Sequence, residues 1–367
     1  MKKDIYLESI DFAGFAKKHS TYEIKAFNHP FVSKLPKHLY KYRKSGEDGR
    51  KKFYIGDRNI FTASFDKLHE ADVFEGVSLA TKQRIKKLDG ESVCRYYKEH
   101  IISVLQEKIP SLDLDKSNAI FDIIIDEHFD SDSIYMRVCP LVKNEERQHL
   151  KTITGALAYL FRNLDDDSIW NKKFKKGMQM LLNINESMGA YCVCDSMSND
   201  QLWSLYADNY TGYCIEYDLT EPCKSKGSIR LISNLYPVTY SKKKDDDWFK
   251  MLYEAIVKTM NSRGMTNQFD SGIFFYQWLL RTLCTKKDSW SYEREWRFLG
   301  DANKNYKGPL ISSIIVGHNI KKKDFDEILN YSKKLGCEIK ITDVDYENQV
   351  VVARSITEED ILKIEKR

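Results

Sequence analysis

Strand-like and helical patterns alternate along this chain in a way that restricts the folds open to it. HLYKYR at 38–43 predicts a strand, and FYIGDRNIFTASF at 53–65 predicts a hairpin or a pair of strands. From about residue 78, apolar residues recur at helical spacing up to about residue 185, and strand patterns then return. We therefore expect one α+β domain over residues 1–367, with 78–185 as a helical insertion.

The segment 191–218, YCVCDSMSNDQLWSLYADNYTGYCIEYD, predicts a unit of strand, short capped helix and strand. We expect this unit, the strand at 38–43 and the stretch 290–298 to meet in one mixed or antiparallel sheet. Further patterns predict strands at 237–240, 311–317 and 337–342, helices at 248–285 and 322–336, and a short helix with an extended arm in residues 1–37.

The stretch WSYEREWRF at 290–298 packs charges among large aromatic side chains. Side chains alternate between the two faces of a strand. One face would then carry Trp290, Tyr292, Arg294, Trp296 and Phe298, and the other would carry Ser291, Glu293, Glu295 and Arg297. The second face presents two carboxylates roughly 7 Å apart beside an arginine. Such a face is either a surface ladder of ion pairs or the floor of a site.

Composition excludes several classes of protein. The net charge of +4 over 367 residues argues against a dedicated, sequence-independent nucleic-acid binder. Eight cysteines and eight histidines show neither Cys-x-x-Cys nor His-Glu-x-x-His spacing, so we expect reduced cysteines and no metal site of these kinds. The sequence has no long apolar run and no signal-peptide pattern, which predicts a cytoplasmic protein without a membrane segment.

Seven motifs stand out along the chain. They are LYKYR at 39–43, the Ser64 region followed by DVFEG at 72–76, CDS at 194–196, LWSLYADNYTGYCIEYD at 202–218, PVTY at 237–240, the K-x3-W-x2-ExExR pattern at 286–297 and IIVG at 314–317. The motifs occur in the order shown by a widespread bacterial family of unknown function, and the chain resembles that family over about residues 38–345. Ala71, Val73 and Asp195 depart from the Asn, Pro and Phe usual in that family.

The layout of these motifs also resembles that of ADP-ribosyltransferases, which implies an ADP-ribosyltransferase-like sheet and NAD as substrate. In that chemistry nicotinamide leaves through an oxocarbenium-like transition state. The resemblance makes Glu295 the carboxylate that stabilises the developing charge, Glu293 the group that orients or deprotonates the acceptor, and Arg43 the ligand of the pyrophosphate. The remaining candidates for NAD binding are the stacking aromatics Tyr42, Trp203 and Tyr206 and one of two serines, Ser64 or Ser196.

Three functions stay open at this stage. The first is an NAD-consuming enzyme that transfers ADP-ribose to a protein or nucleic-acid acceptor, or hydrolyses NAD. Such an enzyme would act as a toxin or antiphage defence effector. That role implies an antitoxin or another regulatory partner. The second is a metal-dependent nuclease with Asp72, Glu75, Glu293 and Glu295 around Mg²⁺ and a lysine, Lys286 or Lys287, beside them. The third is a non-catalytic sensor or binding module in which WSYEREWRF only holds a sheet together.

Overall fold

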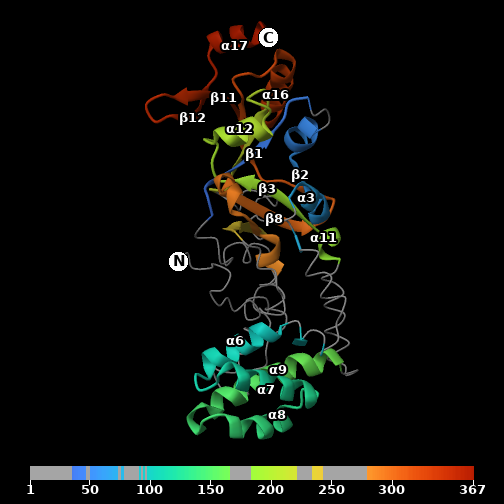
Figure 1. Ribbon diagram of the computed structural model, residues 1–367. Coiled ribbons are helices and arrows are strands. Elements are labelled where there is room, and N and C mark those ends of the chain that lie inside the picture. Colours follow the sequence, from blue (N-terminus) through green and yellow to red (C-terminus); the bar gives the residue numbers. More distant parts are fainter. Residues whose placement is uncertain are drawn as a thin grey trace. The chain divides into compact units, whose positions relative to one another are not determined.

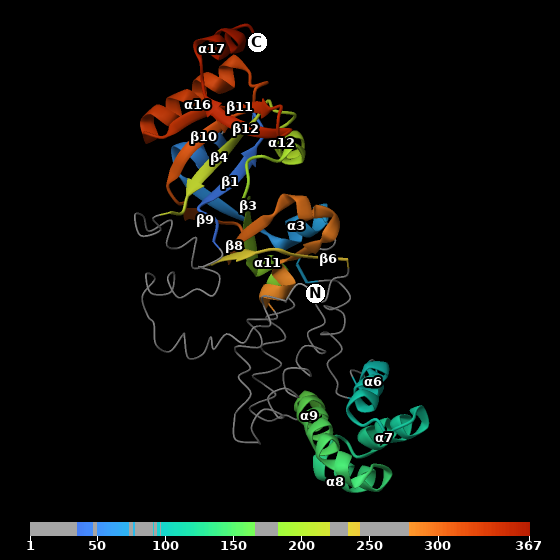
Figure 2. The same cartoon turned by 90° about the vertical axis from the view of Figure 1, so that its left-hand side faces the viewer.

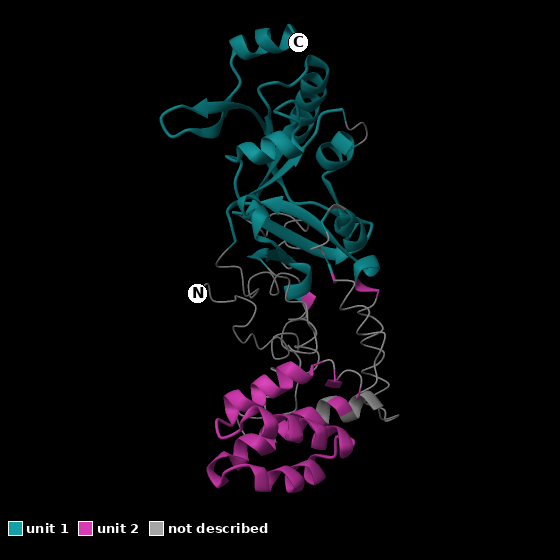
Figure 3. Ribbon diagram, viewed as in Figure 1, with its two compact units in different colours: residues 1–76, 185–244, 280–367 teal, residues 77–184, 245–279 magenta. Residues whose placement is uncertain are grey.

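The computed structural model describes residues 35–46, 50–72, 76–77, 91, 94–95, 97–165, 183–220, 234–242 and 279–367. Contacts between residues divide the chain into two compact units, which Figure 3 colours separately. Unit 1 comprises Met1–Gly76, Asn185–Lys244 and Leu280–Arg367, and unit 2 comprises Val77–Ile184 and Asp245–Leu279. The expected arm of residues 1–37 and the expected helices at 248–285 fall largely outside the described residues.

Unit 2 is helical where it is described. Asp113 and Asp130 each cap the helix that follows by accepting a bond from a backbone N–H of its first turn, as expected for these residues. A core of buried aliphatic and aromatic side chains, centred on Ile120, Phe121 and Phe161, joins the helices. The helices are α6 (Lys98–Lys108), α7 (Leu114–Asp126), α8 (Ser131–Val138) and α9 (Arg147–Asp165), with single 3-10 turns at Cys139–Leu141 and Asn144–Glu146. None of the helices in the described residues is long and apolar enough to cross a membrane.

The core of unit 1 is a sheet that contains ten of its described strands (Figure 1). Their order is β12-β11-β10-β4-β1-β3-β2-β9, with β8 paired to β3 and to β5, and only β10 and β11 run parallel. The strands of this sheet are β1 (His38–Arg43), β2 (Asn59–Ser64), β3 (Met188–Cys194), β4 (Tyr213–Asp218), β5 (Leu235–Pro237), β8 (Glu295–Asp301), β9 (Lys304–Lys307), β10 (Ile311–Val316), β11 (Glu338–Asp345) and β12 (Val350–Ser355).

The expected meeting of distant strands is confirmed. Figure 2 shows β10, β4 and β1 side by side, and β1 also pairs with β3, which in turn pairs with β8 along its whole length. The mostly antiparallel sheet and the α+β class agree with the sequence patterns. A separate parallel pair is formed by β6 (Thr239–Ser241) and β7 (Thr285–Lys287).

The short helix between β3 and β4 is also confirmed as α12 (Asp200–Tyr206). Asn199 caps it by accepting a bond from the Leu202 N–H, and the Asn199 amide donates to the Tyr292 carbonyl at 2.6 Å. The turn after α12 needs glycine at Gly212, because a Cβ there would lie 2.1 Å from the Arg43 carbonyl oxygen. This close approach fixes the end of β1 against the start of β4.

Two sequence predictions are wrong in part. Residues 53–65 do not form a hairpin: a π-helical turn, η2 (Lys52–Gly56), precedes β2. The ammonium of the buried Lys51 contacts Asp324 and Glu327 of α16 (Lys322–Leu335), which anchors that turn by a tertiary contact. In the second case, a 3-10 helix, η7 (Asp288–Glu293), replaces the first half of the strand predicted at 290–298.

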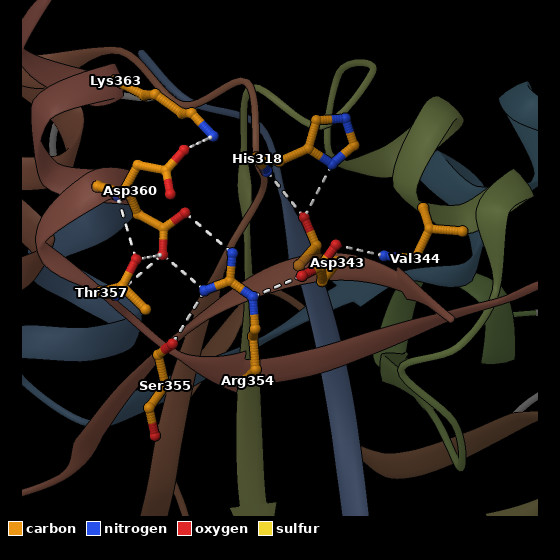
Figure 4. Close-up of polar contacts among 10 residues, drawn as sticks. His318, Asp343, Val344, Arg354, Ser355, Thr357, Asp360 and Lys363 are labelled. Carbon is orange, nitrogen blue, oxygen red and sulfur yellow. Dashed lines mark hydrogen bonds and ion pairs between the residues drawn. The ribbon is translucent and has the colours of Figure 1, made fainter. Parts of the chain in front are cut away.

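Unit 1 also contains the helices α3 (Phe65–Ala71) and α17 (Glu358–Glu365). A short helix, α11 (Ile184–Ser187), begins at the last residue of the first segment of unit 2 and continues into unit 1. A polar network attaches the C-terminal α17 to β12 (Figure 4). The Arg354 guanidinium contacts both carboxylate oxygens of Asp360 at 2.6 and 2.9 Å and also pairs with Asp343 of β11. Thr357 and Asp360 form a capping box at the start of the helix.

Candidate functional site

A cavity of about 710 Å³ opens in unit 1 and is lined by residues of β1, β2, β3, β7, β8, β9, α3, α12 and the η2 and η7 segments. This volume lies within the usual range for small-molecule sites. Arg43, Tyr206, Glu293 and Glu295 line it, so four of the eight site residues predicted from the sequence meet there. A fifth, Tyr42, borders the cavity, although its ring packs against Trp203 on the other face of β1.

Basic side chains line one part of the cavity. Alternation along β1 sends Lys41 and Arg43 to the same face, while Tyr42 packs on the other face against Trp203. The Arg43 guanidinium carbon lies 3.9 Å from the centre of the Tyr54 ring, and Tyr54 stacks on Tyr191 at 6.1 Å. Within the described part of the chain, no carboxylate pairs with Arg43, and its buried Nε atom has no hydrogen-bond partner.

An unpaired guanidinium held against an aromatic ring is suited to an anionic group of a ligand. A buried donor without a partner costs free energy, and a phosphate or carboxylate would satisfy it. Lys44, Arg50 and Lys67 line the same cavity and add positive charge around Arg43.

Two glutamates line another part of the cavity. The Lys286 ammonium lies 2.6 Å from Glu293 Oε2 and 3.1 Å from Glu295 Oε2. Arg297 Nε donates to Glu295 Oε1 at 2.7 Å, and the Tyr206 hydroxyl donates to Glu293 Oε1 at 2.8 Å. Both glutamates are only 5% exposed, so the cluster is largely shielded from water.

Local backbone geometry brings these carboxylates together. η7 ends at Arg294, which takes a left-handed conformation with φ 46° and ψ 49°, and β8 begins at the next residue. Glu293 therefore closes a 3-10 helix while Glu295 opens a strand. The prediction of one continuous strand face is corrected: the two side chains come from different elements and share one ammonium. The Arg294 guanidinium turns away to Asp195 at 2.8 Å.

The two carboxyl groups have opposite pKa shifts. Burial alone would raise the pKa of Glu295, but Arg297 and Lys286 outweigh burial and hold that pKa well below its usual range. Burial raises the pKa of Glu293 above its usual value, because Lys286 only partly offsets the desolvation and the charge of Glu295 adds to it. The site thus pairs a carboxyl group whose surroundings favour the ionised form with one whose surroundings favour the protonated form.

The other three predicted residues do not line this cavity. Ser64 is buried at the start of α3, and the Ser196 carbonyl accepts a bond from the Tyr42 hydroxyl at 3.2 Å. Trp203 is fully buried, donates from its indole nitrogen to the Met197 carbonyl at 2.9 Å and stacks on Tyr210. Neither serine nor Trp203 therefore has a place at the candidate site.

Residues proposed for the metal-dependent alternative are only partly assembled. Lys286 contacts both glutamates, whereas Lys287 is exposed and Asp72 does not line the cavity. Glu75 lies outside the described residues. Where the structure describes the chain, no three His, Cys, Asp or Glu side chains group as potential metal ligands.

Three important groups in the cavity wall are not among the site residues predicted from the sequence: Lys41, Tyr54 and Tyr191. Strand alternation in 38–43 predicts that Lys41 shares a face with Arg43, but it gives Lys41 no role. Tyr54 sits on the π-helical turn and Tyr191 on a strand far along the chain, so no local pattern joins them.

One segment of the chain matches a known protein family. The family model described as "Protein of unknown function (DUF2971)" matches residues 202–298, which include Tyr206, Lys286, Glu293 and Glu295. Neither the curated proteins nor the solved structures contain a match to this chain. The match to this family of unknown function thus covers residues 202–298, which lie within the stretch whose motifs resemble such a family.

Proposed function

We propose that unit 1 binds NAD in this cavity and cleaves the bond between nicotinamide and ribose, passing ADP-ribose to water or to a macromolecular acceptor. The observation that carries the proposal is that one cavity is lined both by the unpaired Arg43 and by the Glu293–Glu295 pair. NAD combines an anionic pyrophosphate with a cationic nicotinamide, so it needs positive charge in one part of its site and carboxylates in another. The likeness to ADP-ribosyltransferases is part of this proposal.

Arg43 would bind the pyrophosphate. A guanidinium presents forked donors that match phosphate oxygens, and among the described residues the Arg43 Nε has no hydrogen-bond partner. The Tyr54 ring, which itself stacks on Tyr191, holds this side chain on the cavity wall, so little ordering is required on binding.

The two glutamates would act on the other half of the ligand. Of the four charged groups in their cluster, Glu293, Glu295 and Lys286 line the cavity, while Arg297 is fully buried and does not. The lining part therefore carries a net negative charge. Glu295, which stays ionised, would stabilise the positive charge that develops as nicotinamide leaves. Glu293, with its raised pKa, would take the proton of the attacking water or acceptor.

The direct test is to incubate the full chain with NAD and to quantify free nicotinamide and ADP-ribose, with and without a metal chelator. The proposal expects release of nicotinamide that the chelator does not suppress. Absence of nicotinamide release with protein or nucleic-acid acceptors present would contradict the proposal. If the chain instead cleaves a nucleic acid or the NAD pyrophosphate only when Mg²⁺ is present, the metal-dependent alternative is favoured. An NAD-consuming activity fits a cytoplasmic toxin or antiphage defence effector restrained by a partner.

Replacing Arg43 should weaken the binding of NAD more than it affects the fold. In Arg43→Met the pyrophosphate loses a charge-assisted bond of about 1.5–3 kcal/mol, so the dissociation constant should rise roughly tenfold to a hundredfold. The dissociation constant of Arg43→Lys should lie between those of the parent and Arg43→Met, because an ammonium lacks the forked pair of donors that a guanidinium presents. Isothermal calorimetry measures the dissociation constant for NAD of the parent and of the two Arg43 variants. The control is Lys37→Met, which removes an exposed cation just before β1. Equal affinities would remove Arg43 from the site.

A further inference from the structure

Three lysines of unit 1 are withdrawn from bulk water, and they differ in what surrounds the ammonium. Lys51 contacts Asp324 and Glu327, and Lys286 contacts Glu293 and Glu295. Lys41 is half-buried in the cavity wall, and among the described residues no carboxylate lies within ion-pair distance of it. Its Nζ donates to the Cys192 carbonyl at 2.5 Å and lies 5.0 Å from the centre of the Tyr191 ring.

The neighbour of Lys41 on the same face of β1 is the cation Arg43. Residues two apart on a strand are separated by roughly 7 Å, so an amine and a guanidinium line the cavity side by side. A lysine becomes nucleophilic when it is desolvated or lies beside another cationic group, and Lys41 meets both conditions.

We propose that Lys41 is a nucleophilic amine that forms a Schiff base with a phosphorylated aldehyde or ketone whose phosphate is bound by Arg43. This activity goes beyond the proposed cleavage of NAD, in which Lys41 has no role, and does not depend on it. The neutral Nζ attacks the carbonyl carbon and forms the carbon–nitrogen bond. Protons pass from nitrogen to the carbonyl oxygen, and that oxygen leaves as water to give the imine.

Electrostatics support this role. Burial first, and then the charge of Arg43, lower the pKa of Lys41 to about 8. The other ionisable groups acting on Lys41 only partly oppose this shift, and they are Cys192 and Cys194 of β3 and Glu295 of β8. By contrast the carboxylate partners raise the pKa of Lys51 and of Lys286. Near neutral pH, Lys41 therefore has a larger share of neutral amine than either of them.

Pyridoxal 5′-phosphate is a suitable probe, because it carries an aldehyde and a phosphate. The full chain is treated with a limiting amount of the probe, the imine is reduced with borohydride, and each labelled lysine is quantified by peptide mass spectrometry. At about pH 7, Lys41 should label at least roughly tenfold faster than the exposed Lys37 and Lys287. Its labelling should be half-maximal near pH 8, since the neutral amine accumulates as the pH rises through the pKa.

Pyridoxal without its phosphate separates a bound probe from simple amine reactivity, because the protein is unchanged. It should label Lys41 roughly tenfold more slowly, while labelling of Lys37 and Lys287 stays the same. The phosphate probe on Arg43→Met should also label Lys41 at least roughly tenfold more slowly, because this variant loses both the phosphate contact and the charge that lowers the pKa of Lys41. ADP-ribose, which also carries phosphates and a latent aldehyde, should compete with the probe. Labelling of Lys41 no faster than that of the exposed lysines, or equal labelling with and without the phosphate, would overturn the proposal whether or not the protein cleaves NAD.

Discussion

Lys286→Met should lower the free energy of unfolding by about 3–5 kcal/mol, because it leaves two buried carboxylates without the ammonium that lies between them. Urea unfolding of the full chain, followed by tryptophan fluorescence, measures the loss. Lys287→Met removes the adjacent, exposed lysine and should change stability by less than about 0.5 kcal/mol.

The free energy of unfolding of Lys286→Met should change with pH in a defined direction. Without Lys286, burial and mutual repulsion raise the pKa of one carboxyl in the folded protein above its value in the unfolded chain. The folded state then binds the additional proton, so stability is lost as the pH rises through the raised pKa. The loss of unfolding free energy relative to the parent should therefore be smaller at about pH 5 than at about pH 8. A loss below about 1 kcal/mol that is independent of pH would mean that the pair behaves as a solvated surface bridge.

Glu295→Gln should reduce nicotinamide release at least roughly a hundredfold, since the amide keeps the size of the side chain but removes the charge that stabilises the transition state. Glu293→Gln is the matched control, because it removes the same charge from the same lysine. It should impair transfer to an acceptor more than cleavage of NAD. In the parent, the rate of transfer should fall with decreasing pH as Glu293 becomes protonated, at a pH above the ordinary range for glutamate. Glu293→Gln should lose this pH dependence.

Both variants also disturb a buried ion cluster, so their thermal midpoints are measured beside their turnover, and turnover is compared well below the lower midpoint. A lowered midpoint with the parent's rate of nicotinamide release in Glu295→Gln would assign this residue to stability alone. In that case the cluster would hold β8 to β7 and η7 without a chemical role.

Much of the sheet could be predicted from local patterns. Two local patterns predict strands correctly. The β-branched run at 311–317 matches a strand that is buried along most of its length, and the alternation in 38–43 matches a strand that is buried in part. Asn199 could be identified as a cap because its side chain satisfies a backbone N–H within the same short segment. In each case the residues that determine the element lie inside it.

The site was less predictable because its geometry depends on distant contacts. The alternation of WSYEREWRF resembles a strand, but Asn199 bonds to the Tyr292 carbonyl and Arg294 turns left-handed before the strand begins. The two glutamates were nevertheless correctly expected to lie together. The contact of Lys286 with both, and the meeting of Arg43 with them in one cavity, arise from the tertiary fold.

A structure of the full chain with a non-cleavable NAD analogue tests most directly whether one ligand spans both parts of this cavity. The account predicts that the pyrophosphate contacts the Arg43 guanidinium and that the nicotinamide-bearing ribose lies against Glu293 and Glu295, beside Tyr206. An analogue bound elsewhere, or a cavity that stays empty at saturating analogue, would contradict it.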